Sequence, residues 1–290
     1  MTKPDPRRNA YRAELAAETL RGTVKAENYA LGQPHHVVAP SLPLRREPRF
    51  DSNLDTEGLL GEAVTVYDEN EGWAWVQLDH DGYVGYMPSE GLVSGVNAPT
   101  HRIAALRTYV FPEPDSKVPP LALLSLNARV TVAKAVGSYL QLESGGFVYG
   151  SHTVPLGVTA PDYVGVAEAF HGTPYLWGGR TSVGTDCSGL VQLAAAAAGH
   201  SVPRDADMQA AETGDEVDWQ AGAELARGDL VFWDGHVGIM TSPDYFLHAN
   251  AFHMAVENEP FVEAQERIKA AGFEVTGVRR LPLSCGKKAR

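Results

Sequence analysis

One of the chain's two cysteines, Cys187, stands in a setting that suits a nucleophile. It follows the triplet Gly-Thr-Asp, and the run after it, LVQLAAAAAG, predicts a helix that ends at Gly199. Asp186 or Thr185 suits the helix start, because a side-chain oxygen there accepts hydrogen bonds from unpaired backbone N–H groups. We therefore expect Cys187 in the first helical turn, where the macrodipole and the N–H groups lower the pKa of a thiol and stabilise an oxyanion.

Two histidines further along the chain could serve this thiol. His236 heads the apolar segment HVGIM, and His248 lies in the next such segment, YFLHAN. A cysteine nucleophile needs a base within hydrogen-bond reach, and that base needs a third group to orient it. If the TSPD turn pairs the two segments as antiparallel strands, His248 can accept a hydrogen bond from the ring of His236. The alternative is that Cys187 is a small buried hydrophobic residue and the histidines are ordinary sheet residues.

Composition and charge argue against several classes of protein. A net charge of −12 over 290 residues argues against a nucleic-acid partner, because phosphate binding depends on clustered Lys and Arg. The histidines and cysteines lack the spacings H-x-x-x-H and C-x-x-C, so we expect neither a metal nor another cofactor.

The N-terminus and the cysteine count bear on location. Pro, Asp and Arg interrupt the N-terminal residues where a signal peptide would be apolar. No window approaches the roughly 18 apolar residues of a membrane span, and Cys187 and Cys285 alone do not make a disulfide framework. We therefore expect a cytoplasmic protein without a membrane partner, and the sequence carries no signal for its oligomeric state.

Two β-rich segments precede the part of the chain that carries Cys187. Helix formers at helical spacing over residues 9–20 predict that residues 1–34 are a helical extension that docks on the body. After it, GEAVTVYDENEGWAWVQLDHDGYVGY and NARVTVAKAVGSYLQLESGGFVYG repeat one order of short strands and tight turns. Both segments resemble bacterial SH3-like domains, which are small β-barrels, and we place them at 35–97 and 98–157.

Residues 158–290 predict a third domain. Helix signals begin at Tyr163, the Cys187 helix follows, and β-rich segments close the chain. This order predicts an α+β domain with an antiparallel sheet. The expected fold is therefore multidomain, with two small SH3-like β-barrels followed by an α+β domain.

Motifs in the third domain resemble those of the NlpC family of papain-like cell-wall cysteine peptidases. They are YLWGG (175–179), TDCSG (185–189), RGDL (227–230) and HVGI (236–239). The combination is most similar to the γ-D-glutamyl-L-diamino acid endopeptidases that process murein peptides, and SH3-like domains are usual partners in that family. The resemblance implies that Cys187 is the nucleophile, His236 the general base and His248 the third polar residue.

The resemblance also implies how substrate is bound. Asp186 and Ser188 would hold the free N-terminal amine and the γ-D-Glu of the substrate, while Tyr175 and Trp177 would line the pocket. Tyr175 could also direct its hydroxyl to the oxyanion. Simpler alternatives remain: Trp177 as a core residue and Asp186 as a helix cap only.

A loop after the Cys187 helix also matches a substrate-contacting segment of the family. Its candidate is Asp205, and the preceding Arg204 is either part of this loop or a surface charge. Some relatives have Ser where this chain has Ala206, so one polar contact of the family is missing here.

In the recycling type of these enzymes, an aromatic residue of the first SH3-like domain closes one end of the groove. Tyr86 is our candidate, with Tyr83, Asp51 and Glu57 as alternatives; the tyrosines could equally fill the barrel. The expected function is a cysteine endopeptidase that cleaves the γ-D-glutamyl-L-diamino acid bond of murein peptides with a free N-terminal L-Ala, in cell-wall peptide recycling. The alternatives are a secreted or surface peptidoglycan hydrolase that its SH3-like domains anchor to the wall, and an inert binding module.

Overall fold

The computed structural model describes residues 3–284, and the chain divides into two compact units between Leu156 and Gly157. Cys285, the second cysteine of the sequence, lies outside the described residues. No helix within 3–284 is long and apolar enough to cross a membrane.

The N-terminal helix expected over residues 9–20 is wrong. Strands β1 (Leu15–Ala17) and β2 (Asn28–Ala30) pair in parallel, with the 3-10 turn η1 (Glu18–Leu20) between them. A lone helix of this length is marginal in water, so tertiary packing decides the conformation. Here Ala10 and Ala17 are buried against Trp75 of the following sheet.

The first β-rich segment forms a seven-stranded sheet in the order β5-β4-β8-β7-β6-β3-β9. Neighbouring strands in this sheet are antiparallel, and tight turns join several of them. Buried and partly exposed residues alternate along β4, as expected for a strand with one face on a core. The strands are β3 (Gln33–Val37), β4 (Ser41–Arg45), β5 (Leu54–Leu59), β6 (Ala63–Asn70), β7 (Trp73–Leu78), β8 (Val84–Pro88) and β9 (Leu92–Ser94), with the 3-10 turn η2 (Ser89–Gly91) before β9.

The second β-rich segment repeats this pattern of pairing. The pairs β4-β5, β4-β8, β7-β8 and β3-β9 recur as β11-β12, β11-β16, β15-β16 and β10-β17. The counterpart of β6 is interrupted at Thr131, so the strands form one three-stranded and one five-stranded sheet. The strands are β10 (His101–Ile103), β11 (Arg107–Phe111), β12 (Ala122–Ser125), β13 (Arg129–Val130), β14 (Val132–Val136), β15 (Tyr139–Leu142), β16 (Phe147–Tyr149) and β17 (Thr153–Pro155), with η3 (Gly150–His152) before β17.

Over residues 157–284, the second unit combines four helices with an antiparallel sheet in the order β20-β25-β21-β22-β23-β24, which is the α+β arrangement that the sequence predicts. The helices are α1 (Tyr163–Glu168), α2 (Cys187–Ala197), α3 (Ala206–Glu212) and α4 (Phe261–Ala270). The strands are β18 (Arg180–Thr181), β19 (Gly184–Thr185), β20 (Asp215–Glu216), β21 (Asp229–Trp233), β22 (His236–Met240), β23 (Tyr245–Asn250), β24 (Ala255–Pro260) and β25 (Gly277–Arg280), with the 3-10 turn η4 (Trp219–Ala221) after β20.

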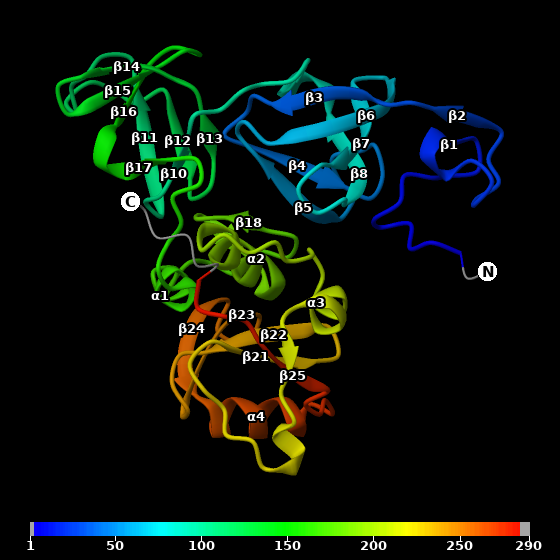
Figure 1. Cartoon of the computed structure of the whole chain (residues 1–290), viewed down its shortest axis with the longest axis vertical. Helices are drawn as coiled ribbons and strands as arrows, with labels where there is room; N and C mark the ends of the chain where they lie inside the picture. Colours follow the sequence, from blue (N-terminus) through cyan, green and yellow to red (C-terminus); the bar gives the residue numbers. More distant parts are fainter. Residues whose placement is uncertain (1–2, 285–290) are drawn as a thin grey trace. The chain divides into compact units, whose positions relative to one another are not determined.

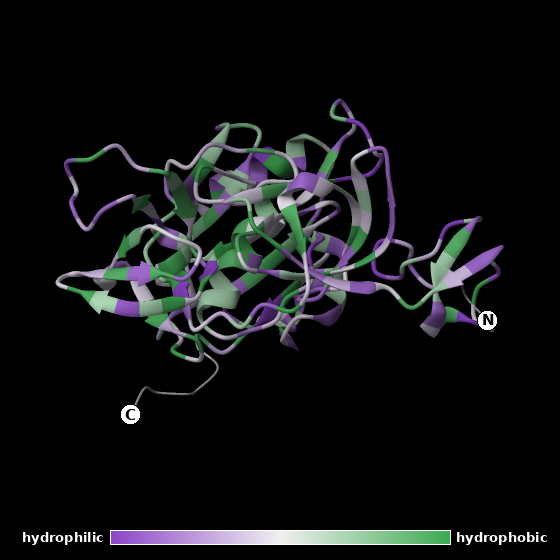
Figure 2. Cartoon of the chain, turned by 90° about the horizontal axis from the view of Figure 1, so that it is seen from above, coloured by the Kyte–Doolittle hydropathy of each residue, from purple (hydrophilic) through white to green (hydrophobic). Residues whose placement is uncertain are grey.

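Helices α2 and α4 pack on the two faces of this sheet (Figure 1). Helix α2 contacts β22 and β23, and all but one of its residues are buried. Its run of alanines lets the helix backbone approach the sheet closely, and the helix ends where Gly199 adopts a positive φ of 90°. Helix α4 covers the other face over a cluster that includes Trp233, Phe246 and Phe261. Figure 2 shows hydrophobic and hydrophilic residues interleaved along several strands, as expected for strands with one buried and one exposed face.

Candidate active site

The start of α2 places Cys187 as the sequence predicts. Asp186 is the N-cap residue, and its Oδ1 accepts a hydrogen bond of 2.7 Å from the N–H of Gly189. A Cβ at Gly189 would lie 2.4 Å from the carbonyl oxygen of Gly179, so only glycine lets the preceding loop pack on the first helical turn. Cys187 is therefore the first residue of α2, held by a capped turn and by the loop.

The thiol of Cys187 is buried, with 8% of the residue exposed. Backbone N–H groups of Val237 and Ser188 hydrogen-bond to the thiol, so its sulfur lies beside the beginning of β22. Burial nevertheless raises the pKa of Cys187 to about 12, and the charge of Asp186 acts in the same direction. The lowered pKa that we expected from the helix start is wrong for this state, because burial outweighs the N–H donors.

The two histidines lie together on the antiparallel pair β22 and β23, as the TSPD turn predicts. Nε2 of His236 and Nδ1 of His248 are 2.8 Å apart, within hydrogen-bond distance. Burial lowers the pKa of His236 to about 3, helped by the neighbouring His248, and burial also lowers the pKa of His248. The structure thus brings His236 and His248 together, and the backbone N–H of Val237, the residue after His236, hydrogen-bonds to the Cys187 thiol.

Two further residues that sequence reasoning missed extend this set. Nε2 of His248 lies 2.7 Å from Oε1 of Glu259, at the end of β24. Arg267 of α4 donates from both terminal nitrogens to the two oxygens of Glu259, with a distance of 2.7 Å from Nη1 to Oε2. Burial would raise the pKa of Glu259, but the hydrogen bonds from His248 and Arg267 outweigh it and hold the pKa well below its usual range.

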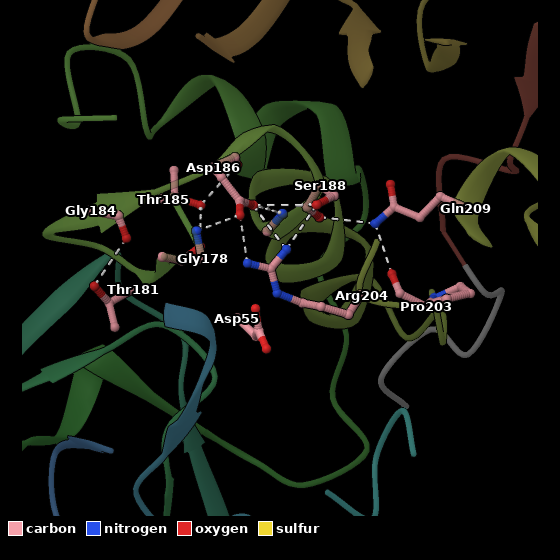
Figure 3. A network of polar contacts seen from close by, with 12 residues as sticks. Asp55, Gly178, Thr181, Gly184, Thr185, Asp186, Ser188, Pro203, Arg204 and Gln209 are labelled. Atoms are coloured by element: carbon pink, nitrogen blue, oxygen red, sulfur yellow. Dashed lines mark hydrogen bonds and ion pairs between the residues drawn. The ribbon is translucent and has the colours of Figure 1, made fainter. Parts of the chain in front are cut away.

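Asp186 and Ser188 belong to a second polar network (Figure 3). Nη1 and Nη2 of Arg204 donate to the two carboxylate oxygens of Asp186 at 3.0 and 2.7 Å, and Nη1 also donates to Oγ of Ser188 at 2.8 Å. Arg204 is only 1% exposed, so its interpretation as a surface charge is wrong. Gln209 of α3 adds a bond of 3.0 Å from Nε2 to the carbonyl oxygen of Ser188. These contacts tie the loop after α2 to the helix start.

The structure also locates the other predicted pocket residues of this unit. Burial raises the pKa of Tyr175 to about 12, and its electrostatic interactions with Cys187 and Asp186 act in the same direction. Trp177 is 65% exposed and is therefore not a core residue. Asp205 occupies the N-cap position of α3, but its side chain makes no capping hydrogen bond.

A cavity of about 210 Å³ lies next to the histidine pair. His236 and His248 form part of its lining, together with Trp233, Phe252 and Arg267. Phe252 is 69% exposed, and the guanidinium of Arg267 stacks 4.3 Å from the centre of its ring. The cavity therefore offers an apolar floor and one cationic group beside the candidate base.

In the first unit, Tyr86 lies in β8 and lines a cavity of about 1060 Å³. Its hydroxyl accepts a hydrogen bond of 2.9 Å from Nη1 of Arg12. Among the alternatives, Tyr83 and Glu57 are buried, and Asp51 is exposed. The role of Tyr86 as a wall of the substrate groove stays a prediction.

The RGDL motif is structural. The carboxylate of Asp229 is fully buried and accepts hydrogen bonds of 2.6 and 2.7 Å from Arg280. Arg227 pairs with Asp162 and Glu168 of the α1 region. Within residues 3–284, no group of three or more His, Cys, Asp or Glu side chains is arranged to hold a metal ion.

Comparisons with known proteins agree with this fold and site. The protein-family model "Bacterial dipeptidyl-peptidase Sh3 domain" matches residues 44–92, which lie in the first of the two β-rich segments. The protein-family model "NlpC/P60 family" matches residues 172–268. The gamma-D-glutamyl-L-lysine dipeptidyl-peptidase of Bacillus subtilis (strain 168) is 30% identical over 229 residues, which cover 71% of this chain and 76% of that protein. Its Bacillus cereus namesake is 27% identical over 241 residues, which cover 72% of this chain and 71% of that protein.

Among solved structures, an NlpC/P60 family protein from Bacillus cereus ATCC 10987 matches with a TM-score of 0.72 and 22% identity. The match covers 86% of this chain and all of the other, and it supports the fold. Fold and site together define a peptidase with an N-terminal bacterial SH3 domain. The chain belongs to the NlpC/P60 family.

Proposed function

We propose that this chain is a cysteine endopeptidase that hydrolyses the γ-D-glutamyl-L-diamino acid bond of murein peptides with a free N-terminal L-Ala. The observation that carries the chemistry is the thiol at the start of α2 beside the hydrogen-bonded pair of His236 and His248. The names of the two Bacillus relatives support the bond, and the term dipeptidyl-peptidase supports a free N-terminus.

The proposed reaction begins from an uncharged thiol and an uncharged imidazole. Cys187 attacks the carbonyl carbon of the scissile amide while His236 takes the thiol proton, so a tetrahedral oxyanion and an imidazolium form together. The N–H groups at the start of α2 and the Tyr175 hydroxyl stabilise the oxyanion. His236 then protonates the leaving amine, a thioester remains, and a water molecule that His236 activates hydrolyses it.

Substrate recognition follows from the groups around the thiol. Asp186 and Ser188 face the N-terminal part of the substrate, and Arg204 fixes their orientation through its hydrogen bonds. The leaving amine must reach His236, so in this proposal the diamino acid that carries it binds next to the ring of His236. Tyr175, Trp177 and Asp205 complete the pocket in this proposal.

We further propose a role for the first unit. The repeated strand pairing supports a second SH3-like barrel after the one that the family model matches. Tyr86 is our candidate in this unit for a residue that excludes a peptide still linked to a glycan. Such an enzyme acts on released peptides, in cytoplasmic cell-wall recycling.

A wall hydrolase is the second candidate, and one observation favours it. Tyr109, Phe111, Tyr139 and Tyr149 form a continuous series of ring contacts on the five-stranded sheet, with centroid distances between 5.6 and 6.3 Å. Tyr109 and Tyr149 are 49% and 39% exposed. Exposed aromatic patches mark interaction surfaces, and this one could hold the enzyme on a wall polymer.

Paired substrates test the proposal. The full chain is incubated with L-Ala-γ-D-Glu-L-Lys, with its meso-diaminopimelate counterpart, with N-acetylated forms of both, and with intact sacculi. We expect cleavage of the free peptides alone, and no cleavage by the Cys187→Ala variant. Equal cleavage of acetylated peptides, or release of fragments from sacculi, would favour the wall hydrolase. Cleavage by Cys187→Ala at the wild-type rate would refute cysteine catalysis.

A further inference from the structure

A chain of hydrogen-bonded side chains extends behind the candidate base. It runs from His236 to His248, from His248 to Glu259 and from Glu259 to Arg267. His248 is 1% exposed, and the Glu259 side chain is 10% exposed, so solvent has little access to these bonds. The sequence of donors and acceptors in these hydrogen bonds therefore determines which ring nitrogen of each histidine carries the proton.

The protons can be assigned from the acceptor end. An ionised carboxylate only accepts hydrogen bonds, so Nε2 of His248 must carry a proton toward Glu259. A neutral imidazole has a single N–H, so Nδ1 of His248 is an acceptor and Nε2 of His236 must be the donor to it. Nδ1 of His236 is then left with its lone pair. This nitrogen can accept a proton, and the N–H of the next residue, Val237, hydrogen-bonds to the Cys187 thiol.

Arg267 keeps Glu259 ionised and in place. Its two terminal nitrogens bind the two carboxylate oxygens, which is the geometry that fixes a carboxylate most firmly. The other ionisable groups at this site are His253, whose Nε2 lies 3.4 Å from Oε1 of Glu259, and Glu263, whose charge acts on Arg267. His253 reaches the same oxygen from the loop after β23 and, when protonated, would compete with His248 for it.

We infer that Glu259 and Arg267 are positioning residues for catalysis: they fix the tautomers of both histidines and make Nδ1 of His236 the general base. The inference rests on the proposed cysteine peptidase activity and goes beyond its three catalytic residues. The negative charge of Glu259 also stabilises the imidazolium that forms when the thiol proton moves to His236.

Two variants on the same strand provide the kinetic test. Glu259→Gln removes the charge and lets an amide N–H face His248, whereas Glu257→Gln makes the same change at a residue that bonds the exposed His171. For Glu259→Gln we expect kcat on the free tripeptide to fall at least about 10- to 100-fold, the range found when the partners that orient metal-bound histidines are removed, with little change in KM. The acid limb of the pH profile should move to lower pH, because Glu259 raises the pKa of His248. Glu257→Gln should match wild type in kcat, in KM and in its pH profile.

A second measurement does not depend on substrate. Nitrogen-15 NMR of the histidine rings in the full chain should show both His236 and His248 protonated at Nε2, and Glu259→Gln should give mixed tautomers. Wild-type His236 protonated at Nδ1 would overturn the inference, even if the peptide is cleaved. An unchanged kcat and pH profile in Glu259→Gln would overturn it as well. If wild type cleaves no peptide, the proposed function fails, and the NMR spectra still decide the tautomers.

Discussion

Replacement of Arg204 by methionine should destabilise the second unit strongly. Arg204 is 1% exposed and pairs with an Asp186 side chain that is 10% exposed. Removing one partner of a buried ion pair costs about 3–5 kcal/mol, because the other charge stays buried. Asp186 would keep the N–H groups of Gly178 and Gly189 and the hydroxyl of Ser188 as donors, which favours the lower end of this range.

Differential scanning calorimetry of the full chain measures this loss. A cost of about 3 kcal/mol corresponds to a fall in Tm of roughly 10 °C for a domain of this size. Lys269→Met is the matched control, since Lys269 pairs with Glu274 in an exposed ion pair of the same unit. The double variant Asp186→Asn with Arg204→Met should recover part of the loss, because it leaves no buried charge unpaired. A Tm for Arg204→Met equal to that of Lys269→Met would refute the reasoning.

Three further predictions concern the thiol, the base and the pocket. Because burial raises the pKa of Cys187 to about 12, alkylation by iodoacetamide should accelerate about tenfold per pH unit from pH 6 to 9; a plateau would indicate a preformed thiolate. The pKa of His236 in the folded chain, about 3, lies below its unfolded value near 6.5, so the free energy of unfolding should decrease as pH falls below 6.5. Between pH 7 and pH 5, thermal unfolding should show a smaller loss of unfolding free energy for His236→Gln than for wild type. Trp177→Ala should raise KM and leave stability within about 0.5 kcal/mol, as calorimetry and steady-state kinetics can check, since this side chain is 65% exposed.

The candidate catalytic residues could be predicted from the sequence because short-range signals mark them. A capping residue, a helix-forming run and a glycine at its end place Cys187 within one or two residues. The TSPD turn between two short apolar segments fixes the pairing of β22 and β23, and with it the meeting of His236 and His248. Local chemistry determines both features, so no tertiary information was needed.

The residues that were missed depend on long-range packing. Glu259 meets His248 only because β24 pairs with β23 in one particular register, opposite Phe246, and a shift by one residue would turn its side chain to the other face. Arg204 is polar and follows a turn, so nothing local indicates that it is buried. The N-terminal segment has helix formers at helical spacing, but contacts with Trp75 determine its extended form. The only hint in the sequence of the ion pair between Glu259 and Arg267 is their spacing of eight residues, which is a weak signal.

The order of the hydrogen-bonded residues along the chain has a consequence for biosynthesis. Cys187, His236, His248, Glu259 and Arg267 follow one another in sequence, so a ribosome adds the nucleophile first and the arginine that holds the carboxylate last. At about 5–20 residues per second, the 80 residues from Cys187 to Arg267 take roughly 4 to 16 s to translate. During that time the nascent chain contains the thiol without the carboxylate and arginine that orient the histidines, so under the proposed mechanism full activity requires α4.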